Sequence, residues 1–211
     1  MTIQQLLLLA PPILIALSFH EFAHAFVANR LGDDTAKQRG RLTLNPLAHL
    51  DPIGTIMIFI VRFGWAKPVP VNPLNLANPK RDMLWISLAG PLSNMLLAFI
   101  SGLLLRVMIR TDGGNPTDAL STVIYAMLLF SVQINLALAI FNILPIAPLD
   151  GSKILFGVLP RHHERKMIWL ERNGPFLLIG LIVLGRLTGF SFLGLLIWPF
   201  VRFFSALFTG L

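Results

Sequence analysis

Residues 3–28 read IQQLLLLAPPILIALSFHEFAHAFVA, a long apolar run whose ionisable residues are His20, Glu21 and His24. A bilayer core about 30 Å thick is crossed by a helix of about 20 apolar residues. The run is therefore long enough to span a membrane. Because it has no basic segment before it and no A-x-A-like cleavage site after it, we expect it to remain in the mature protein.

The composition of the whole chain also indicates a membrane protein. Of its 211 residues, 55% are hydrophobic and 13% are charged, and the mean hydropathy is +0.73. A soluble domain is normally less apolar and more charged. There are no cysteines, so disulfides, thiol nucleophiles and thiolate metal sites are excluded. Any metal site must use His, Asp or Glu side chains.

Two further segments, 83–109 and 119–142, are long and apolar enough to span, and with 3–28 they are the predicted core spans. The shorter apolar segments 174–187 and 190–207 could either span or lie re-entrant. No repeat, composition shift or flexible linker divides the chain. We therefore expect residues 1–211 to form a single integral-membrane domain.

The net charge of +7 is explained by topology, so nucleic acid is not an expected partner. Eight of the seventeen Lys and Arg residues lie within 30–82, and more follow the third span, but few lie in the connection near 110–118. Basic loops stay in the cytoplasm. The first and third connections are thus predicted to be cytoplasmic, and residues 110–118 external.

Within the first connection, residues 40–44 and 53–63 have a strand-like composition but are too short to span. Irregular backbone at membrane depth persists only where protein buries it or where it lines a cavity. We therefore expect small β-strands in the connection 37–72, folded against the core helices. The predicted fold is an all-α polytopic membrane protein, with a three-helix core and one or two further apolar helices.

The segment His20-Glu21-Phe22-Ala23-His24 has the pattern H-E-x-x-H. On a helix, the i, i+4 spacing puts both imidazoles on one face beside the glutamate, as two zinc ligands and a general base require. Each charged group in a membrane helix costs about 2.5–3.5 kcal/mol and normally marks a functional site. The alternative is a helix-end cluster at the headgroups, in which Glu21 snorkels or pairs with Arg30.

A third ligand is available after the third span, where residues 142–151 read NILPIAPLDG. The prolines break the helix and return Asp150 to apolar surroundings. Asp150 is therefore the candidate third ligand. The alternative is an ordinary turn residue before Gly151.

Other polar residues have more than one open interpretation. In residues 89–94, AGPLSN, Gly90 suits a close helix approach, and the Asn94 amide could donate a hydrogen bond to an oxyanion. Small and polar residues also simply hold membrane helices together. His49 and Asp51 could form hydrogen bonds within their loop, support a metal ligand or contact substrate.

Taken in order, these motifs resemble the site-2 protease family of intramembrane zinc metalloproteases, in its compact subgroup without PDZ or CBS domains. The resemblance covers most of residues 15–155. The matching stretches are HEFAH at 20–24, NPLAHLDPIG at 45–54, GWAKPVPVN at 64–72, AGPLSN at 89–94 and NILPIAPLDG at 142–151. One departure is Ala147, which stands where the family usually has a second proline. This change can loosen the loop that presents Asp150, but it removes no ligand.

The resemblance implies a three-helix catalytic core and one zinc ion per chain, with Glu21 as general base. The implied zinc ligands are His20, His24 and Asp150, and the motif positions associated with the active site are Asn94 and Asn142. It also implies hydrolysis of a membrane-embedded substrate, which we expect to need an unwound helix because a helix hides its amides. We expect the protein to lie in the bilayer of a prokaryotic cell (inner) membrane, with its active site toward the cytoplasm. The alternative function is a metal or proton transporter using the same His/Asp cluster, which would have no need of Glu21 as a base.

Overall fold

The computed structural model describes residues 3–54, 57, 64–111 and 118–211. Within these residues, five helices are long and apolar enough to cross a membrane. They are α1 (Ile3–Arg30), α5 (Pro79–Thr111), α6 (Ala119–Ile143), α8 (Glu164–Thr188) and α9 (Phe192–Thr209). The predicted all-α polytopic fold is confirmed.

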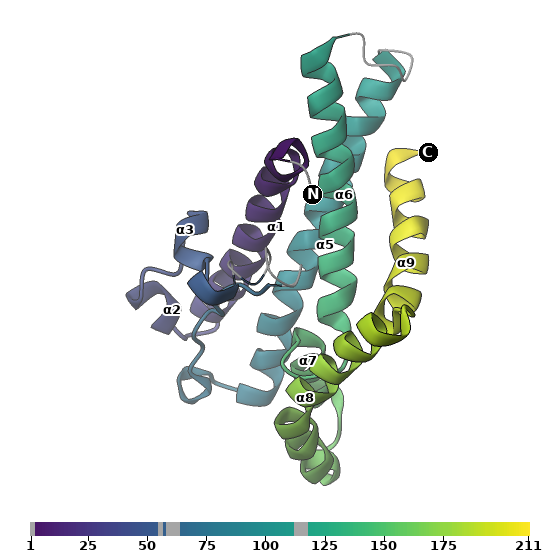
Figure 1. Ribbon diagram of the computed structural model, residues 1–211. Helices are drawn as coiled ribbons and strands as arrows, with labels where there is room; N and C mark the ends of the chain where they lie inside the picture. The colour runs from purple at the N-terminus through teal and green to yellow at the C-terminus, as the bar shows by residue number, and fades with distance from the viewer. Residues whose placement is uncertain (1–2, 55–56, 58–63, 112–117) are drawn as a thin grey trace.

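Helices α1, α5 and α6 pack side by side as the central bundle (Figure 1). Small side chains make this packing close: Ala16, Ala25 and Ala28 of α1 are fully buried. Without a hydrophobic drive between helices in lipid, such close backbone approach supplies much of the association energy. The bundle corresponds to the predicted core spans, and α5 begins earlier than expected, at Pro79.

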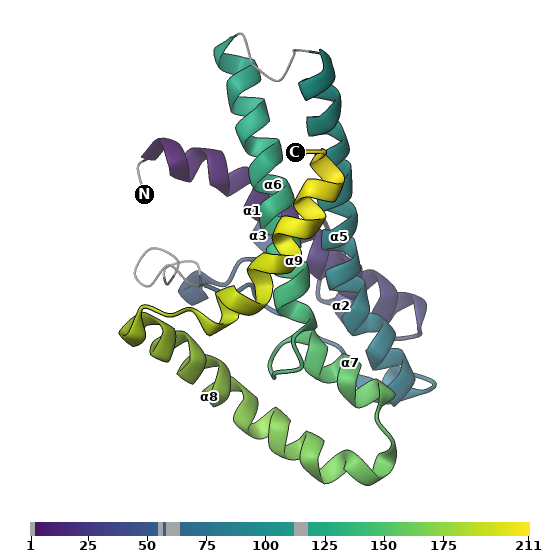
Figure 2. The same cartoon turned by 90° about the vertical axis from the view of Figure 1, so that its right-hand side faces the viewer.

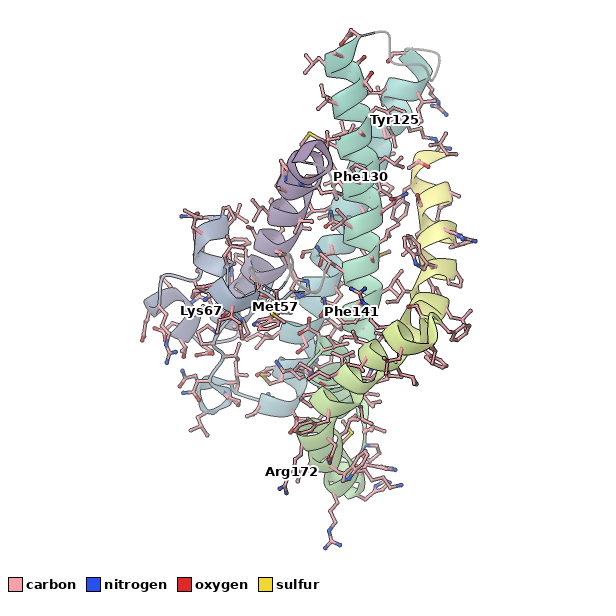
Figure 3. The ribbon with its side chains drawn as sticks, in the orientation of Figure 1. Met57, Lys67, Tyr125, Phe130, Phe141 and Arg172 are labelled. Atoms are coloured by element: carbon pink, nitrogen blue, oxygen red, sulfur yellow. The ribbon has the colours of Figure 1, made fainter. Side chains whose placement is uncertain are left out.

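Helices α8 and α9 flank this bundle: α8 contains the predicted segment 174–187, and α9 contains all of 190–207 except its first two residues. Figure 2 shows α8 running obliquely beneath the bundle before α9 rises beside α5 and α6. Val201 of α9 is buried against Ala98 and Val132 of the bundle. In Figure 3, Arg172 of α8 lies at the end of the molecule opposite to Tyr125 of α6.

The short elements lie in the connections. Between α1 and α5 these are α2 (Thr35–Gln38), α3 (Pro46–His49) and the 3₁₀ turn η1 (Pro73–Asn75). After α6 come α7 (Asp150–Val158) and the 3₁₀ turn η2 (Arg161–His163).

The small β-strands predicted for 37–72 are wrong for the part of this connection that the structure describes. It contains one isolated antiparallel bridge, Leu50 to Ala66. Side chains satisfy the backbone instead: Asn45 accepts from the N–H of Leu47, and Asn72 accepts from the N–H of Leu74. Most of the predicted strand 53–63 lies outside the described residues.

Candidate metal centre

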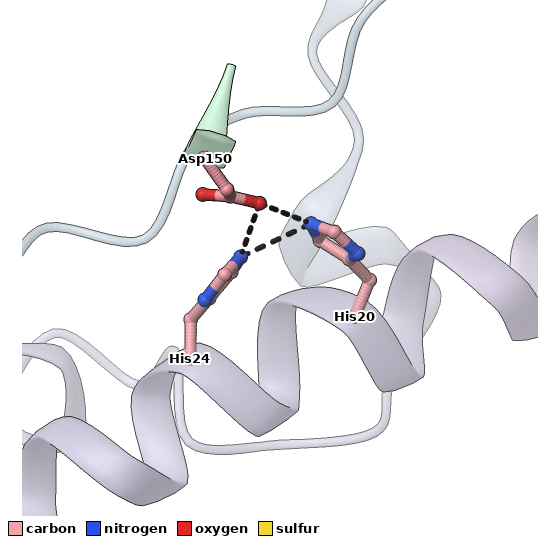
Figure 4. Close-up of side chains that lie close together, drawn as sticks. All are labelled: His20, His24 and Asp150. Carbon is pink, nitrogen blue, oxygen red and sulfur yellow. Dashed lines mark hydrogen bonds and ion pairs between the residues drawn. The ribbon is translucent and has the colours of Figure 1, made fainter. Parts of the chain in front are cut away.

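Three potential metal ligands meet where α1 passes the start of α7 (Figure 4). His20 and His24 lie one turn apart on α1, and Asp150 is the first residue of α7. Oδ2 of Asp150 lies 3.2 Å from Nε2 of His20 and 3.2 Å from Nε2 of His24. The two Nε2 atoms are 3.0 Å apart. The structure thus brings together the residues predicted to bind zinc.

This triangle of donor atoms fits a zinc ion. Atoms bound to zinc at about 2.0–2.2 Å in a tetrahedral site lie about 3.3 Å from one another. Three protein ligands also leave a fourth position for water or substrate, as in catalytic zinc sites. The donor set of two imidazoles and one carboxylate is one that zinc hydrolases use.

The outer nitrogens of the two imidazoles are also engaged. Nδ1 of His24 donates to the backbone carbonyl of Ile86 at 2.6 Å, and Nδ1 of His20 lies 2.6 Å from Oδ1 of Asn94. A carbonyl oxygen can only accept, so the hydrogen of His24 is on Nδ1. Its Nε2 is left with a lone pair directed at the cluster, which is what a metal ligand needs.

Glycine permits the close packing around the cluster. A Cβ atom on Gly151 would lie 2.1 Å from the carbonyl oxygen of Ile143, so α7 can begin directly against the end of α6. Gly90 of α5 faces the imidazoles in the same way, which is the close approach expected there. The Asp-Gly pair is therefore the start of a helix that presents a carboxylate, rather than a simple turn.

Asp150 is ready to act as an anionic ligand. Burial of its carboxyl opposes ionisation, but when the imidazoles are doubly protonated, the charge of His24 and hydrogen bonds from both rings outweigh burial. As a result, the pKa of Asp150 lies well below its usual value. The N-terminus of α7 further favours the negative charge.

Glu21 is buried beside the two histidines, and it is bound by a segment distant in sequence. The backbone N–H of Val69 donates to its Oε2 at 3.0 Å. Arg41 lies on the same side, buried, and donates from Nη2 to the carbonyl of Lys67. Burial lowers the pKa of Arg41 and the charge of Glu21 opposes that effect. The connection before α5 thus supplies a hydrogen bond and a nearby positive charge to Glu21.

The remaining predicted residues lie outside the metal cluster. Asn94 is fully buried and contacts His20, whereas Asn142 donates to the carbonyl of Leu138 in its own helix at 3.0 Å. Nε2 of His49 donates to the carbonyl of Thr43 at 2.8 Å, and Oδ1 of Asp51 accepts from the N–H of Gly54 at 2.7 Å. These last two bonds are hydrogen bonds within the loop, which was one of the three interpretations of His49 and Asp51.

Sequence reasoning missed the contribution of Val69 and that of Asn135, a buried amide on α6 that contacts Asn94. A signal for Asn135 was present, because an amide in an apolar span costs free energy unless it is hydrogen-bonded. No pattern identified Val69, because its contribution is a backbone N–H.

The protein thus has apolar helices that are long enough to span a membrane, and they surround a His/His/Asp donor set. These features define an integral membrane protein whose metal centre resembles those of zinc hydrolases. The model of peptidase family M50 matches residues 106–181. The chain is 41% identical over 201 residues to "Putative zinc metalloprotease YwhC" of Bacillus subtilis, covering 94% of this chain and 91% of that one. It is 31% identical to "Putative zinc metalloprotease Rip2" of Mycobacterium tuberculosis, over 89% of this chain and 70% of that one. No solved structure matches.

The chain therefore belongs to peptidase family M50, the site-2 protease family of zinc metalloproteases. It is a metalloprotease that acts on protein substrates, and zinc is its cofactor. The predicted family and cofactor are confirmed.

Proposed function

We propose that this protein is an intramembrane protease that hydrolyses peptide bonds of membrane-embedded helical substrates. One observation carries the proposal: the donor triangle of His20, His24 and Asp150 is built on apolar helices, two of its members on a candidate span. A site on such helices suits a substrate segment that enters the bundle from lipid. The family membership favours proteolysis over the alternative of metal or proton transport.

In this proposal His20, His24 and Asp150 hold one zinc ion. A bound zinc supplies Lewis acidity, which lowers the pKa of water and polarises a carbonyl. Glu21 is the general base. It accepts a proton from the attacking water, whose oxygen bonds to the carbonyl carbon, and then gives the proton to the leaving nitrogen as the C–N bond breaks. Asn142, whose amide donates one bond to Leu138, is a candidate for donating to the oxyanion.

The substrate must offer an extended backbone at the site. A membrane helix keeps its amides in its own hydrogen bonds, so the scissile segment has to unwind first. Segments with helix-breaking residues unwind at lower cost, because Pro and Gly are the weakest helix formers. We therefore expect such segments to be cleaved faster than stable helices.

We further propose a cell (inner) membrane location in a prokaryote, with the site open to the cytoplasmic side and residues 1–211 acting as one domain. The positive-inside distribution of Lys and Arg supports this orientation. The relatives from Bacillus and Mycobacterium support a prokaryotic host. Hydrolysis needs water, and the basic connections lie on the side of the membrane from which water would enter.

The test uses the purified full chain in lipid vesicles, with two synthetic membrane helices that differ only in one central Gly-Pro pair. Glu21→Gln should keep its zinc and lose at least about 100-fold in cleavage rate, the usual contribution of a general base. Asp150→Ala should lose zinc. Wild-type cleavage by Glu21→Gln would refute the base assignment, and full zinc occupancy in Asp150→Ala would refute the ligand set. Equal cleavage of the two helices would refute the unwinding requirement.

A further inference from the structure

A chain of buried amides extends from His20 through the central bundle. Nδ1 of His20 lies 2.6 Å from Oδ1 of Asn94 on α5. Nδ2 of Asn94 donates to Oδ1 of Asn135 on α6 at 2.8 Å. Both asparagines are completely buried. Two hydrogen bonds thus join the three helices α1, α5 and α6 next to the metal centre.

Two backbone carbonyls fix which way each amide faces. Nδ2 of Asn94 also donates to the carbonyl of Ala16 at 3.1 Å, and Nδ2 of Asn135 donates to the carbonyl of Ser131 at 2.9 Å. Because a carbonyl oxygen only accepts, the nitrogen of each amide must face it. The oxygen of Asn135 therefore faces Asn94, and the oxygen of Asn94 faces His20.

This orientation fixes the hydrogen of His20. Facing an acceptor, Nδ1 must carry the hydrogen, so Nε2 keeps the lone pair that points at His24 and Asp150. Both amide hydrogens of Asn94 are already donated, to Ala16 and to Asn135. None is left for a substrate oxyanion in this arrangement. The hydrogen bonds of Asn94 thus favour a positioning role over the oxyanion role considered from the sequence.

We propose that Asn94 and Asn135 are positioning residues for zinc binding, with Asn135 acting on His20 through Asn94. The proposal rests on the proposed ligand role of His20. Without Asn135, one hydrogen of Asn94 is left unpaired in a buried site. The present orientation of the Asn94 amide is then stabilised by one hydrogen bond fewer. If the amide flipped, its NH₂ group would face Nδ1 of His20. The other ring tautomer would follow, with a hydrogen on the atom that has to bind the metal.

The test measures the zinc dissociation constant of the full chain in detergent by competition with a chromophoric chelator. Loss of a partner that orients a metal-ligating histidine typically weakens metal binding about 10–100-fold. We expect such a loss for Asn94→Leu and a loss of about tenfold for Asn135→Leu. Asn94→Asp should bind zinc more tightly than Asn94→Leu, because its carboxyl, protonated on the oxygen that faces Ala16 and Asn135, still accepts from Nδ1 of His20.

Asn135→Asp is the conservative partner of Asn135→Leu. Its protonated carboxyl still accepts from Asn94 and donates to Ser131, so it should restore most of the affinity. Gln133→Leu is the matched control, since it removes an amide two residues away on α6 where it lines the hollow against α9. A thermal unfolding curve for each variant separates local effects from loss of the fold.

A second measurement reads the tautomer itself. In metal-free protein labelled with ¹⁵N-histidine, the shifts of His20 should identify Nδ1 as the protonated nitrogen in the wild type, and Asn135→Leu should show a mixture. Folded Asn135→Leu with wild-type zinc affinity and a wild-type tautomer would overturn the proposal. His20→Ala distinguishes a failure of this proposal from a failure of the proposed ligand role of His20. If His20→Ala kept full zinc affinity, the ligand assignment itself would be wrong.

Discussion

Gly90 of α5 and His24 of α1 are packed so closely that no side chain fits between them. A Cβ atom on Gly90 would lie 2.5 Å from Nε2 of His24 and 2.6 Å from Nε2 of His20. The α5 helix therefore forms one wall of the metal centre. The histidines cannot move away freely, because their Nδ1 atoms are bonded to Ile86 and Asn94.

We predict that Gly90→Ala damages the metal centre without unfolding the bundle. A methyl group in this space must displace an imidazole, and overpacking of this kind costs about 1–3 kcal/mol. Zinc affinity should fall at least about tenfold, and cleavage should fall with it. Leu92→Ala is the control, because that side chain is more than half exposed on the same helix. If Gly90→Ala bound zinc as tightly as Leu92→Ala, α5 would not form the wall described.

A second prediction concerns the N–H of Val69, which lies between Pro68 and Pro70 and is bonded to Glu21. Val69→Pro removes this donor, whereas Val69→Ala keeps it. A hydrogen bond to a charged group contributes about 1.5–3 kcal/mol, so misplacement of Glu21 should lower kcat about tenfold or more. Zinc content should be unchanged, since the hydrogen bond that is lost goes to Glu21 and not to a metal ligand. Equal activity of the two variants would show that the bond does not hold the base in place.

The candidate metal ligands could be named from the sequence because each of their motifs is local in sequence. The pattern of His20 and His24 fixes one helix face by itself, and the prolines before Asp150 mark where the chain leaves the span. The spans were predictable because apolar length is a property of the sequence alone. The connection between α1 and α5 could be located in the same way, as the stretch between two apolar spans.

The internal structure of that connection was not predictable. Its strand-like composition suggested small strands, but its backbone groups bond to distant partners, as Val69 does with Glu21 and Asn72 with Asp33. Which partners meet depends on how the helices pack. The link from Asn135 to His20 escaped prediction for the same reason, because it depends on the rotation of α6 against α5.

A third prediction concerns Asp33, which ties the end of α1 to the segment before α5. Its buried carboxylate accepts from the N–H of Asn72 at 2.7 Å, from Nδ2 of Asn75 at 2.8 Å and from Thr35. Burial opposes ionisation, but these hydrogen bonds outweigh it, so the pKa of Asp33 is below its ordinary value. A depressed folded-state pKa means that Asp33 stabilises the fold fully above about pH 4. That stabilisation is lost as the pH falls through the folded-state value.

Asp33→Asn should therefore loosen the Asn72 region even at neutral pH. Losing charged hydrogen bonds of about 1.5–3 kcal/mol should speed amide exchange at Asn72 about 10–100-fold, as measured by hydrogen exchange. The wild type should show the same loosening only in acid, below about pH 4. Asp34→Asn is the control, since the Asp34 carboxylate accepts from Gln38 at the surface. Unchanged exchange in Asp33→Asn would mean that other contacts hold this segment.

The last prediction concerns the loop that presents Asp150, where Ala147 replaces the second proline of the family pattern. The loop is held from outside by α8: a Cβ atom on Gly174 would lie 2.6 Å from the carbonyl oxygen and 2.7 Å from Cβ of Ala147. Gly174→Leu must push α8 and this loop apart, so zinc affinity and cleavage should both fall about tenfold or more, by the overpacking cost of about 1–3 kcal/mol. Gly180→Leu makes the same change on the same helix, where a Cβ atom would meet open space, and it should behave as wild type. Equal zinc affinities for the two variants would show that the loop keeps Asp150 in position without α8, so that Ala147 needs no compensation from this helix.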